Sequence, residues 1–278
     1  MTMLLTPEAI DQYSRDGFIA PIPLLDLETA NSIRKALEAY EAQNGGPLKG
    51  SVRFKSHLLF RWLADLVRLP KLLDAVEDLI GPDILCWTSQ WWIKEPHSPQ
   101  FVSWHQDSRY WGVDTDRLVT AWVALSPATV DSGCMRCIPG SHLGPDLTHE
   151  DTWDDDNMLT RGQEIRIEVN EEKAVNIEVG TGEAALFTYR IVHASHPNQS
   201  DDRRIAVAFR FIPPDARQTL AEWDSASLVR GTDNHGHFVH EPYPACDFDP
   251  VAVDFHRRAD ENQRRILYRG TGRAGHRT

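Results

Sequence analysis

From Ile84 onward the sequence is a succession of short segments rich in β-branched and aromatic residues, which Gly, Pro and Asp separate. The segments read ILCWTSQWWIK, LVTAWVALSP, EIRIEVN, AVNIEVG, EAALFTYRIV and RRIAVAFRFIPP. Strand-length segments of this composition and density are typical of antiparallel sandwiches and barrels. The sequence therefore predicts a mainly β fold, a double-sheet jelly roll with flanking helices packed on one outer face.

Helical patterns occupy the chain before these strands. Thr6 and Pro7 suit the N-cap and the first position of a helix. Residues 26–40 carry apolar side chains at helical spacing, and residues 66–79 form a further helical stretch. The order of helices first and strands later places the jelly roll in the second part of the chain.

The domain organisation is predicted to be simple, because the chain has no internal repeat and no low-complexity linker. We expect one domain over residues 1–278. It would comprise a helical N-terminal part (6–80), the jelly-roll core (84–215) and a C-terminal extension (216–278). The extension is charged and weakly patterned, which indicates a surface helix and a tail.

Charge and composition narrow the possible partners. The formal net charge of -12 repels a phosphate backbone, so a nucleic-acid partner is not expected. Four cysteines are too few for a disulfide framework. The sequence has neither a basic leader followed by an apolar stretch nor an apolar run of about 18 residues, so no membrane partner is expected. We expect a cytoplasmic monomer or homodimer that acts on a small-molecule substrate.

The segment Trp104-His105-Gln106-Asp107 is the main indication of chemistry. On an extended segment, side chains two residues apart point to the same side. A second histidine from a later strand would complete a face of two histidines and one carboxylate, which is typical of non-haem iron(II) oxygenases. Such a face leaves three coordination positions open, two for a 2-oxo acid and one for oxygen. By itself, a His-x-Asp tripeptide is more often a surface histidine beside a turn-capping aspartate.

His193 is the candidate for the second histidine. It follows a predicted strand, a polar turn comes next, and the following strand begins with Arg203-Arg204. Such a hairpin can bring His193 and a basic residue into one cleft, where arginine suits bidentate pairing with a carboxylate. Alternation places the two arginines on opposite sides of the strand, so at most one enters the cleft. Both can also be solvated charges.

Several motifs, in this order, resemble the phytanoyl-CoA dioxygenase family of iron(II)- and 2-oxoglutarate-dependent oxygenases. The resemblance covers residues 8–215, and its marks are DGF at 16–18, LIGPDIL at 79–85, WHQD at 104–107, GCMRCIPGSH at 133–142 and HASHPNQSDDRR at 193–204. It implies a double-stranded β-helix, with Fe(II), 2-oxoglutarate and O2 as cofactor and co-substrates. It also implies that His105, Asp107 and His193 bind the iron. His196 competes with His193 by residue type, but the family pattern matches His193.

The resemblance further implies residues that bind 2-oxoglutarate. The family's basic residue for the distal carboxylate lies eleven positions after the last histidine, which selects Arg204 over Arg203. Ser195 matches a serine that assists the same carboxylate. The other positions that match this pocket are Gln90, Trp122 and, with a looser alignment, Lys55.

The residues after the first ligands are expected at the mouth of the pocket. An arginine beside aromatic rings suits a small anion, or a zwitterion whose cation rests on a ring face. The predicted substrate-binding residues are Arg109, Tyr110, Trp111 and Asn198. Halogenating relatives lack the carboxylate at the position of Asp107, so this chain is expected to hydroxylate. The predicted reaction is hydroxylation of a small polar organic molecule, for example an aminoalkylphosphonate or related zwitterion, with release of succinate and CO2.

Other functions stay open on the sequence alone. One is a tailoring hydroxylase that acts on a secondary metabolite or an amino acid. Another is a metal-binding cupin-like protein that uses no 2-oxoglutarate, against which Arg204 and Ser195 argue. A third is a sensor or binding protein on the same fold, which a degenerate triad would favour, whereas this triad is complete.

Several weaker features have an ordinary structural interpretation beside a functional one. Cys134 and Cys137 form a CxxC pattern, which is expected to fill a strand rather than to act in redox chemistry. The acidic segment 151–157 is expected to be a solvated loop, the alternative being a lid over the pocket. The histidines His235, His237 and His240 are expected in a polar loop, the alternative being a metal site. The tryptophans Trp87, Trp91 and Trp92 are expected mostly in the core, the alternative being a wall of the substrate pocket, with Trp87 and Trp91 on one face of their strand.

Overall fold

A computed structural model describes residues 4–273. Its α-helices are α1 (Pro7–Asp16), α2 (Leu27–Gln43), α3 (Arg61–Leu66), α4 (Pro70–Ile80), α5 (Ser108–Trp111) and α6 (Pro250–Leu267). The first two begin as predicted, because the side chain of Thr6 caps α1 and that of Asp26 caps α2. The prediction of one helix over residues 66–79 is wrong. Pro70 lacks a backbone N–H and therefore starts a new helix, α4, after α3 has ended.

The strands form a large sheet, a small sheet and a hairpin. The large sheet has the order β1-β9-β4-β11-β2-β12-β13, the small sheet β3-β10-β5-β8, and the hairpin pairs β6 with β7. Their bounds are β1 (Phe18–Pro23), β2 (Ile84–Lys94), β3 (Val102–His105), β4 (Val119–Ala124), β5 (Met135–Cys137), β6 (His149–Asp151), β7 (Gln163–Ile165), β8 (Val175–Ile177), β9 (Glu183–Thr188), β10 (His193–Ser195), β11 (Arg204–Ile212), β12 (Ser225–Arg230) and β13 (Val239–His240). The predicted mainly β jelly roll with flanking helices is confirmed.

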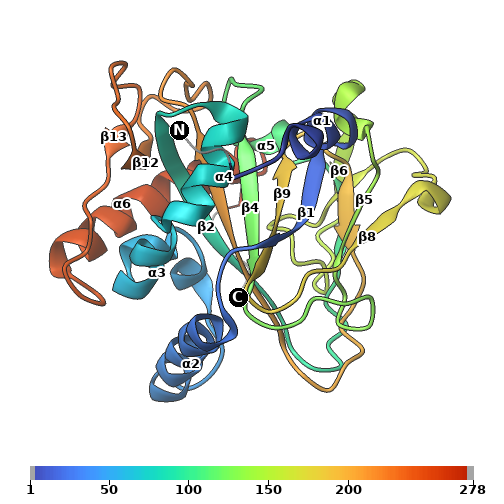
Figure 1. Cartoon of the computed structure of the whole chain (residues 1–278), viewed down its shortest axis with the longest axis horizontal. Coiled ribbons are helices and arrows are strands. Elements are labelled where there is room, and N and C mark those ends of the chain that lie inside the picture. The colour runs from blue at the N-terminus through green and yellow to red at the C-terminus, as the bar shows by residue number, and fades with distance from the viewer. Residues whose placement is uncertain (1–3, 274–278) are drawn as a thin grey trace.

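Two apolar layers hold this architecture together. The larger layer packs α2, α3 and α4 against one face of the large sheet, with residues such as Leu37, Leu72 and Phe209 fully buried. The smaller layer lies between the two sheets and includes Ala208 of β11 and Met135 of β5. Figure 1 shows these helices grouped on one side of the large sheet and β5 and β8 on the other. The face of β11 that points away from the helices therefore lines the space between the sheets.

The large sheet includes strands from outside residues 84–215, the range expected for the jelly-roll core. β1 comes from the part expected to be helical, and it pairs with β9. β12 comes from the C-terminal extension and pairs with β2. The expected surface helix, α6, has a buried face that includes His256 and Leu267. Long-range strand pairing and helix packing of this kind leave little trace in local composition.

A bulge in β2 changes which tryptophans share a face. Thr88 pairs with Arg210 but Cys86 pairs with Phe211, so Trp87 is an extra residue in β2. A bulge breaks the two-residue alternation. Trp91 therefore packs in the layer under the helices, whereas Trp87 packs with Trp111 on the opposite side. The prediction that Trp87 and Trp91 share a face is wrong.

Within residues 4–273, none of the helices combines the length and the apolar character that a membrane crossing requires.

Candidate metal centre and its two cavities

His105 and His193 face each other across two neighbouring strands. They are direct partners in the antiparallel pairing of β3 with β10, and their rings lie 4.1 Å apart between centroids. Asp107 lies beyond the end of β3, at the residue before α5 and in a helical backbone conformation. A turn, and not strand alternation, therefore brings its carboxylate to the histidines. Gln106 fixes this turn, because its buried side chain bonds the backbone of Arg190 and of Leu147.

The rings of both histidines are oriented by the backbone. Nδ1 of His105 lies 2.9 Å from the carbonyl oxygen of Ser103, and Nδ1 of His193 lies 3.0 Å from that of Ile191. Each Nδ1 therefore donates a hydrogen bond, which leaves the lone pair on Nε2 for a metal.

The three side chains converge on one point. Nε2 of His105 is 3.5 Å from Oδ1 of Asp107, and Nε2 of His193 is 4.0 Å from Oδ2. One ligand atom from each residue lies within 4.8 Å of the other two, and all three residues are buried. In residues 4–273 this is the one cluster of three or more His, Cys, Asp or Glu with such spacing.

The pKa values of His193 and Asp107 favour the protonation states that bind a metal cation. Burial, and next the neighbouring His105, lower the pKa of His193 to about 4, so its imidazole is neutral near pH 7. Burial opposes ionisation of Asp107, but His105, His193 and Arg210 together outweigh it and lower the pKa of that carboxyl. A neutral imidazole and an ionised carboxylate are the forms that bind a divalent metal. The donor set therefore suits Fe(II).

A first cavity extends from the triad to Arg204. Its walls include Trp122, Ser195 and Phe187. Arg204 is 2% exposed, and its guanidinium lies over the ring of Trp122 and donates to the carbonyl of Gly133 at 2.7 Å. Its Nε has no hydrogen-bond partner within residues 4–273. A buried guanidinium with a donor left over fits a carboxylate that arrives from outside the chain.

Lys94 is a second buried basic residue near Arg204 that the sequence did not indicate. It is the strand partner of Arg204, and its Nζ donates to Oγ of Ser195 at 2.7 Å and to the carbonyl of His196. Burial, and next Arg204, lower the pKa of Lys94 to about 6. Lys94 thus fixes the hydroxyl of Ser195 toward the end of the cavity where Arg204 lies. The sequence alone does not place Lys94 beside Arg204, because this requires the register in which β2 pairs with β11.

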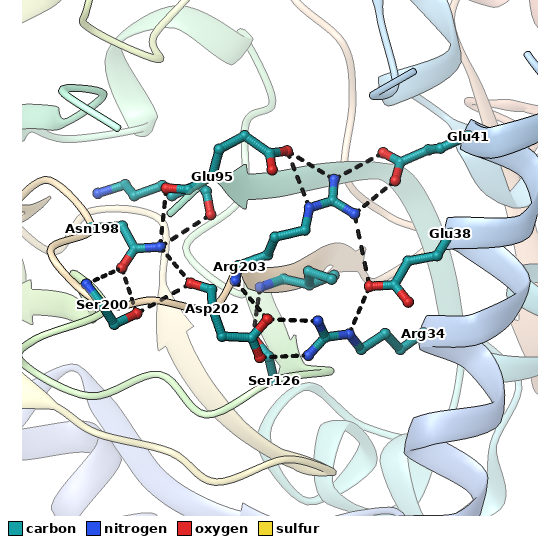
Figure 2. A network of polar contacts seen from close by, with 11 residues as sticks. Arg34, Glu38, Glu41, Glu95, Ser126, Asn198, Ser200, Asp202 and Arg203 are labelled. Atoms are coloured by element: carbon teal, nitrogen blue, oxygen red, sulfur yellow. Dashed lines mark hydrogen bonds and ion pairs between the residues drawn. The ribbon is translucent and has the colours of Figure 1, made fainter. Parts of the chain in front are cut away.

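Arg203 points the opposite way, toward α2. Figure 2 shows its guanidinium between the carboxylates of Glu41 and Glu95, and Arg34 of the same helix pairs with Asp202 beside it. Arg203 therefore joins the end of β2 to the helical layer and does not reach the cavity. The expected alternation of the two arginines agrees with this arrangement.

A second cavity adjoins the first at the triad. It shares Trp92, His105, Asp107 and Arg210 with the first cavity. Its other walls come from five separate parts of the chain: Phe54, Thr88, Gln90, Tyr110, Trp111, Leu159, Thr160, Gln163, Gln263 and Leu267. Tyr110 and Trp111 are thus near the metal centre as expected. Gln90, expected in the 2-oxoglutarate pocket, lines this second cavity instead.

Two of the predicted substrate-binding residues, Arg109 and Asn198, line neither cavity. Arg109 is exposed. Asn198 is buried in the turn after β10, where its amide donates to the backbone carbonyls of Lys94, Glu95 and Asp202 (Figure 2). Those bonds use its donors to hold the turn, so a substrate does not meet them.

Lys55 belongs to a buried ion pair outside both cavities. Its Nζ lies 2.5 Å from the carboxylate of Glu241 and also donates to the carbonyls of Trp87 and Ser225. His57 pairs with the other oxygen of Glu241 at 2.9 Å. This network ties residues before β2 to β12 and to the segment that follows β13. The expectation that Lys55 binds 2-oxoglutarate is therefore wrong.

We expect Lys55→Met to lower the free energy of unfolding by about 3–5 kcal/mol, because it leaves the Glu241 carboxylate buried without its cation. Urea unfolding measures this change. The apparent affinity for 2-oxoglutarate should stay within threefold of wild type. Lys49→Met, at an exposed lysine, is the matched control and should change neither quantity. A normal stability for Lys55→Met would contradict the structural role.

The weaker sequence features have the following places. Cys134 and Cys137 are buried and form no disulfide, and burial raises the pKa of both thiols. His196 is exposed beside Arg136, away from the triad. His240 pairs with Asp233 on the surface.

The acidic segment 151–157 is a mostly exposed loop that ends in an anchored residue. Asn157 is buried and donates to Oγ of Ser103 on β3. The residues that follow, Leu159 and Thr160, line the second cavity. The segment therefore carries a wall of that cavity at its end.

Comparison with known proteins identifies the family of this chain. The sequence profile described as phytanoyl-CoA dioxygenase (PhyH) matches residues 13–206, more than half of the chain. The chain is 29% identical over 181 residues to a probable alpha-ketoglutarate-dependent hypophosphite dioxygenase of Stutzerimonas stutzeri, over 64% of this chain and 62% of that protein. It is 29% identical over 164 residues to the human peroxisomal phytanoyl-CoA dioxygenase, over 56% of this chain and 46% of that protein. The chain thus spans less than two thirds of the length of these relatives.

Solved structures give a fuller match. A non-heme monooxygenase, ThoJ in its apo form, superposes with a TM-score of 0.83 at 33% identity, over 93% of this chain and 97% of that one. Its nickel complex superposes with a TM-score of 0.75 at 31% identity, over 92% and 99% of the two chains.

Proposed function

Because the chain belongs to the phytanoyl-CoA dioxygenase family, we propose that it is an Fe(II)- and 2-oxoglutarate-dependent oxygenase that hydroxylates a small polar organic molecule. The observation that carries this proposal is the cluster of His105, Asp107 and His193 at the junction of two cavities. A 2-oxo acid would occupy the first cavity and the primary substrate the second. The metal would then lie between the two reactants.

The metal would be held by Nε2 of His105, Nε2 of His193 and the carboxylate of Asp107. When bound, Fe(II) and 2-oxoglutarate would activate O2: 2-oxoglutarate is oxidised to succinate and CO2 and takes one oxygen atom, and the other oxygen atom is inserted into a substrate C–H bond to give C–OH. This chemistry belongs to the cofactors, and the chain supplies binding and orientation. The backbone carbonyls behind each imidazole keep the two rings aimed at one point.

Arg204 and Ser195 would hold the distal carboxylate of 2-oxoglutarate. The unpartnered Nε of Arg204 supports this assignment, as does the hydroxyl of Ser195 that Lys94 fixes. Trp122 and Phe187 line the same cavity and limit the access of water to it. A desolvated carboxylate–guanidinium contact is stronger than the same contact in water.

The substrate class we propose is a small molecule that carries an anionic group, with an aminoalkylphosphonate or related zwitterion as the example expected from the sequence. The relative from Stutzerimonas stutzeri is named for hypophosphite, a small phosphorus oxyanion. Tyr110 and Trp111 give the second cavity an aromatic wall.

The test of the proposal is succinate formation. Wild-type protein supplied with Fe(II), O2 and 2-oxoglutarate should form succinate even without a substrate, at the slow uncoupled rate. Omission of Fe(II) or of O2 should stop it. A protein that binds Fe(II) but forms no succinate would be a metal-binding cupin-like protein and not this oxygenase.

A further inference from the structure

Arg210 is a buried arginine that the proposed co-substrate site does not use. It is 4% exposed, and it lines both cavities beside His105 and Asp107. Its guanidinium lies 4.6 Å from the centre of the Trp111 ring. Within residues 4–273, its Nε and Nη1 have no hydrogen-bond partner. Arg203, directly before the same strand, is by contrast paired with Glu41 and Glu95.

Two threonines flank Arg210 at the same level of the large sheet. Arg210 pairs with Thr88 on β2 and with Thr120 on β4, so the three side chains form one row across three strands. We call it the Thr–Arg–Thr row. Both threonine hydroxyls are buried and also lack a hydrogen-bond partner in the described part of the chain. Thr88 lines the second cavity and Thr120 the first.

Unpartnered buried polar groups are rare, because each one costs free energy that a bound partner would restore. The row gathers four such atoms: two hydroxyl oxygens and two guanidinium nitrogens. A guanidinium flanked by hydroxyl donors is complementary to a carboxylate or a phosphonate, whose oxygens accept several hydrogen bonds at once. The groups therefore fit an oxyanion that the chain itself does not supply.

We infer that the Thr–Arg–Thr row binds the anionic group of the primary substrate, a carboxylate or a phosphonate, beside the metal centre. The inference rests on the proposed oxygenase function for the identity of the reaction. Arg204 already provides the cation for 2-oxoglutarate, and it lies six residues away along β11, which is about 20 Å between the two Cα atoms. The row spans the junction of the two cavities, since Thr120 lines the first, Thr88 the second and Arg210 both. Its distance from Arg204 therefore favours the other reactant.

The row would fix the substrate by its charge and leave the rest of the molecule against the aromatic wall. Ala206 and Ala208 are the residues of β11 on the same face between the two arginines. Their small side chains leave room between the co-substrate end and the substrate end. The spacing of Arg204 and Arg210 along β11 would thus keep the carboxylate of 2-oxoglutarate apart from the anionic group of the substrate.

The test is calorimetric titration of protein loaded with Ni(II) and 2-oxoglutarate, which binds without turning over. The probes are 2-aminoethylphosphonate and butyrate, with ethanolamine as a probe that lacks the anion. We expect at least one of the two anions to bind and ethanolamine not to bind. Arg210→Gln and Thr88→Val should each weaken that binding, the arginine variant at least tenfold. Thr88 lines the second cavity and not the first, so Thr88→Val should keep the affinity for 2-oxoglutarate within threefold of wild type.

Binding that persists in Arg210→Gln, or the absence of binding by both anions to wild type, would overturn the inference. So would an equal loss of 2-oxoglutarate affinity, which would assign the row to the co-substrate. Thermal unfolding of the metal-free protein controls for folding. Thr88→Val removes an unpartnered buried hydroxyl, so its melting temperature should equal or exceed that of wild type. Succinate formation by the wild type tests the oxygenase proposal separately, so the two ideas can fail independently.

Discussion

Alanine at His105, Asp107 or His193 is expected to reduce Fe(II)-dependent succinate formation by more than about a hundredfold, since loss of even an outer-shell partner can cost that much. Each residue supplies one of three donors, and their ligand atoms lie within 4.8 Å of one another. Two donors that remain would hold the metal weakly and would leave an extra position open to water. The loss should therefore appear in metal affinity as well as in turnover.

Ni(II) titration followed by thermal unfolding separates the two effects. Wild type should gain stability on Ni(II) addition, and the three variants should gain little. Without metal, their melting temperatures should stay near that of wild type, because β3 and β10 pair through their backbones and not through the metal. His196→Ala is the matched control, since His196 is exposed and pairs with Arg136. Near-normal activity of any triad variant would remove that residue from the ligand set.

Arg204→Ala is expected to raise the apparent KM for 2-oxoglutarate by roughly 30-fold or more, which corresponds to a cost of about 2–5 kcal/mol for a buried charge pair. The guanidinium lies in a desolvated cavity with Trp122 on one side and a donor unused. Steady-state succinate assays at varied 2-oxoglutarate measure the change.

Arg203→Ala is the matched control for this prediction. It should leave the KM within threefold, but it should lower stability, because Glu41 would lose its cation in a nearly buried site. The two neighbouring arginines are thus expected to separate co-substrate binding from stability. Equal KM effects would mean that the register of β11 is shifted by one residue, since such a shift exchanges the two faces.

The metal centre could be predicted from the sequence because its residues lie in short, ordered motifs. His105 and Asp107 are two residues apart, and His193 precedes a polar turn that leads to the strand beginning at Arg204. The prediction that these two strands form a hairpin is wrong, because β10 and β11 belong to different sheets. Two-residue alternation along a strand explains the position of His105 but not that of Asp107. The strand ends at His105, and a turn that the side chain of Gln106 anchors brings the carboxylate of Asp107 toward the two histidines.

Arg210 was within reach of the same sequence reasoning. It lies an even number of residues after Arg204, so the alternation that selects one arginine also places the other on the same face. Whether that face is lined by a cavity, and whether its donors are satisfied, depends on the strands at either side. Thr88 and Thr120 come from β2 and β4, which only the sheet order brings next to β11.

The sequence by itself determined the fold class, the family and the three candidate ligands, because strand composition, motif order and close spacing are local properties of the chain. The tertiary structure alone decided which residues surround that centre. A bulge at Trp87 reverses the alternation of β2, and an ion pair with Glu241 takes Lys55 away from the pocket. The second cavity is completed by Leu267 of α6, far from the triad in sequence. Such placements follow from the register and packing of distant segments, for which a single sequence carries no local pattern.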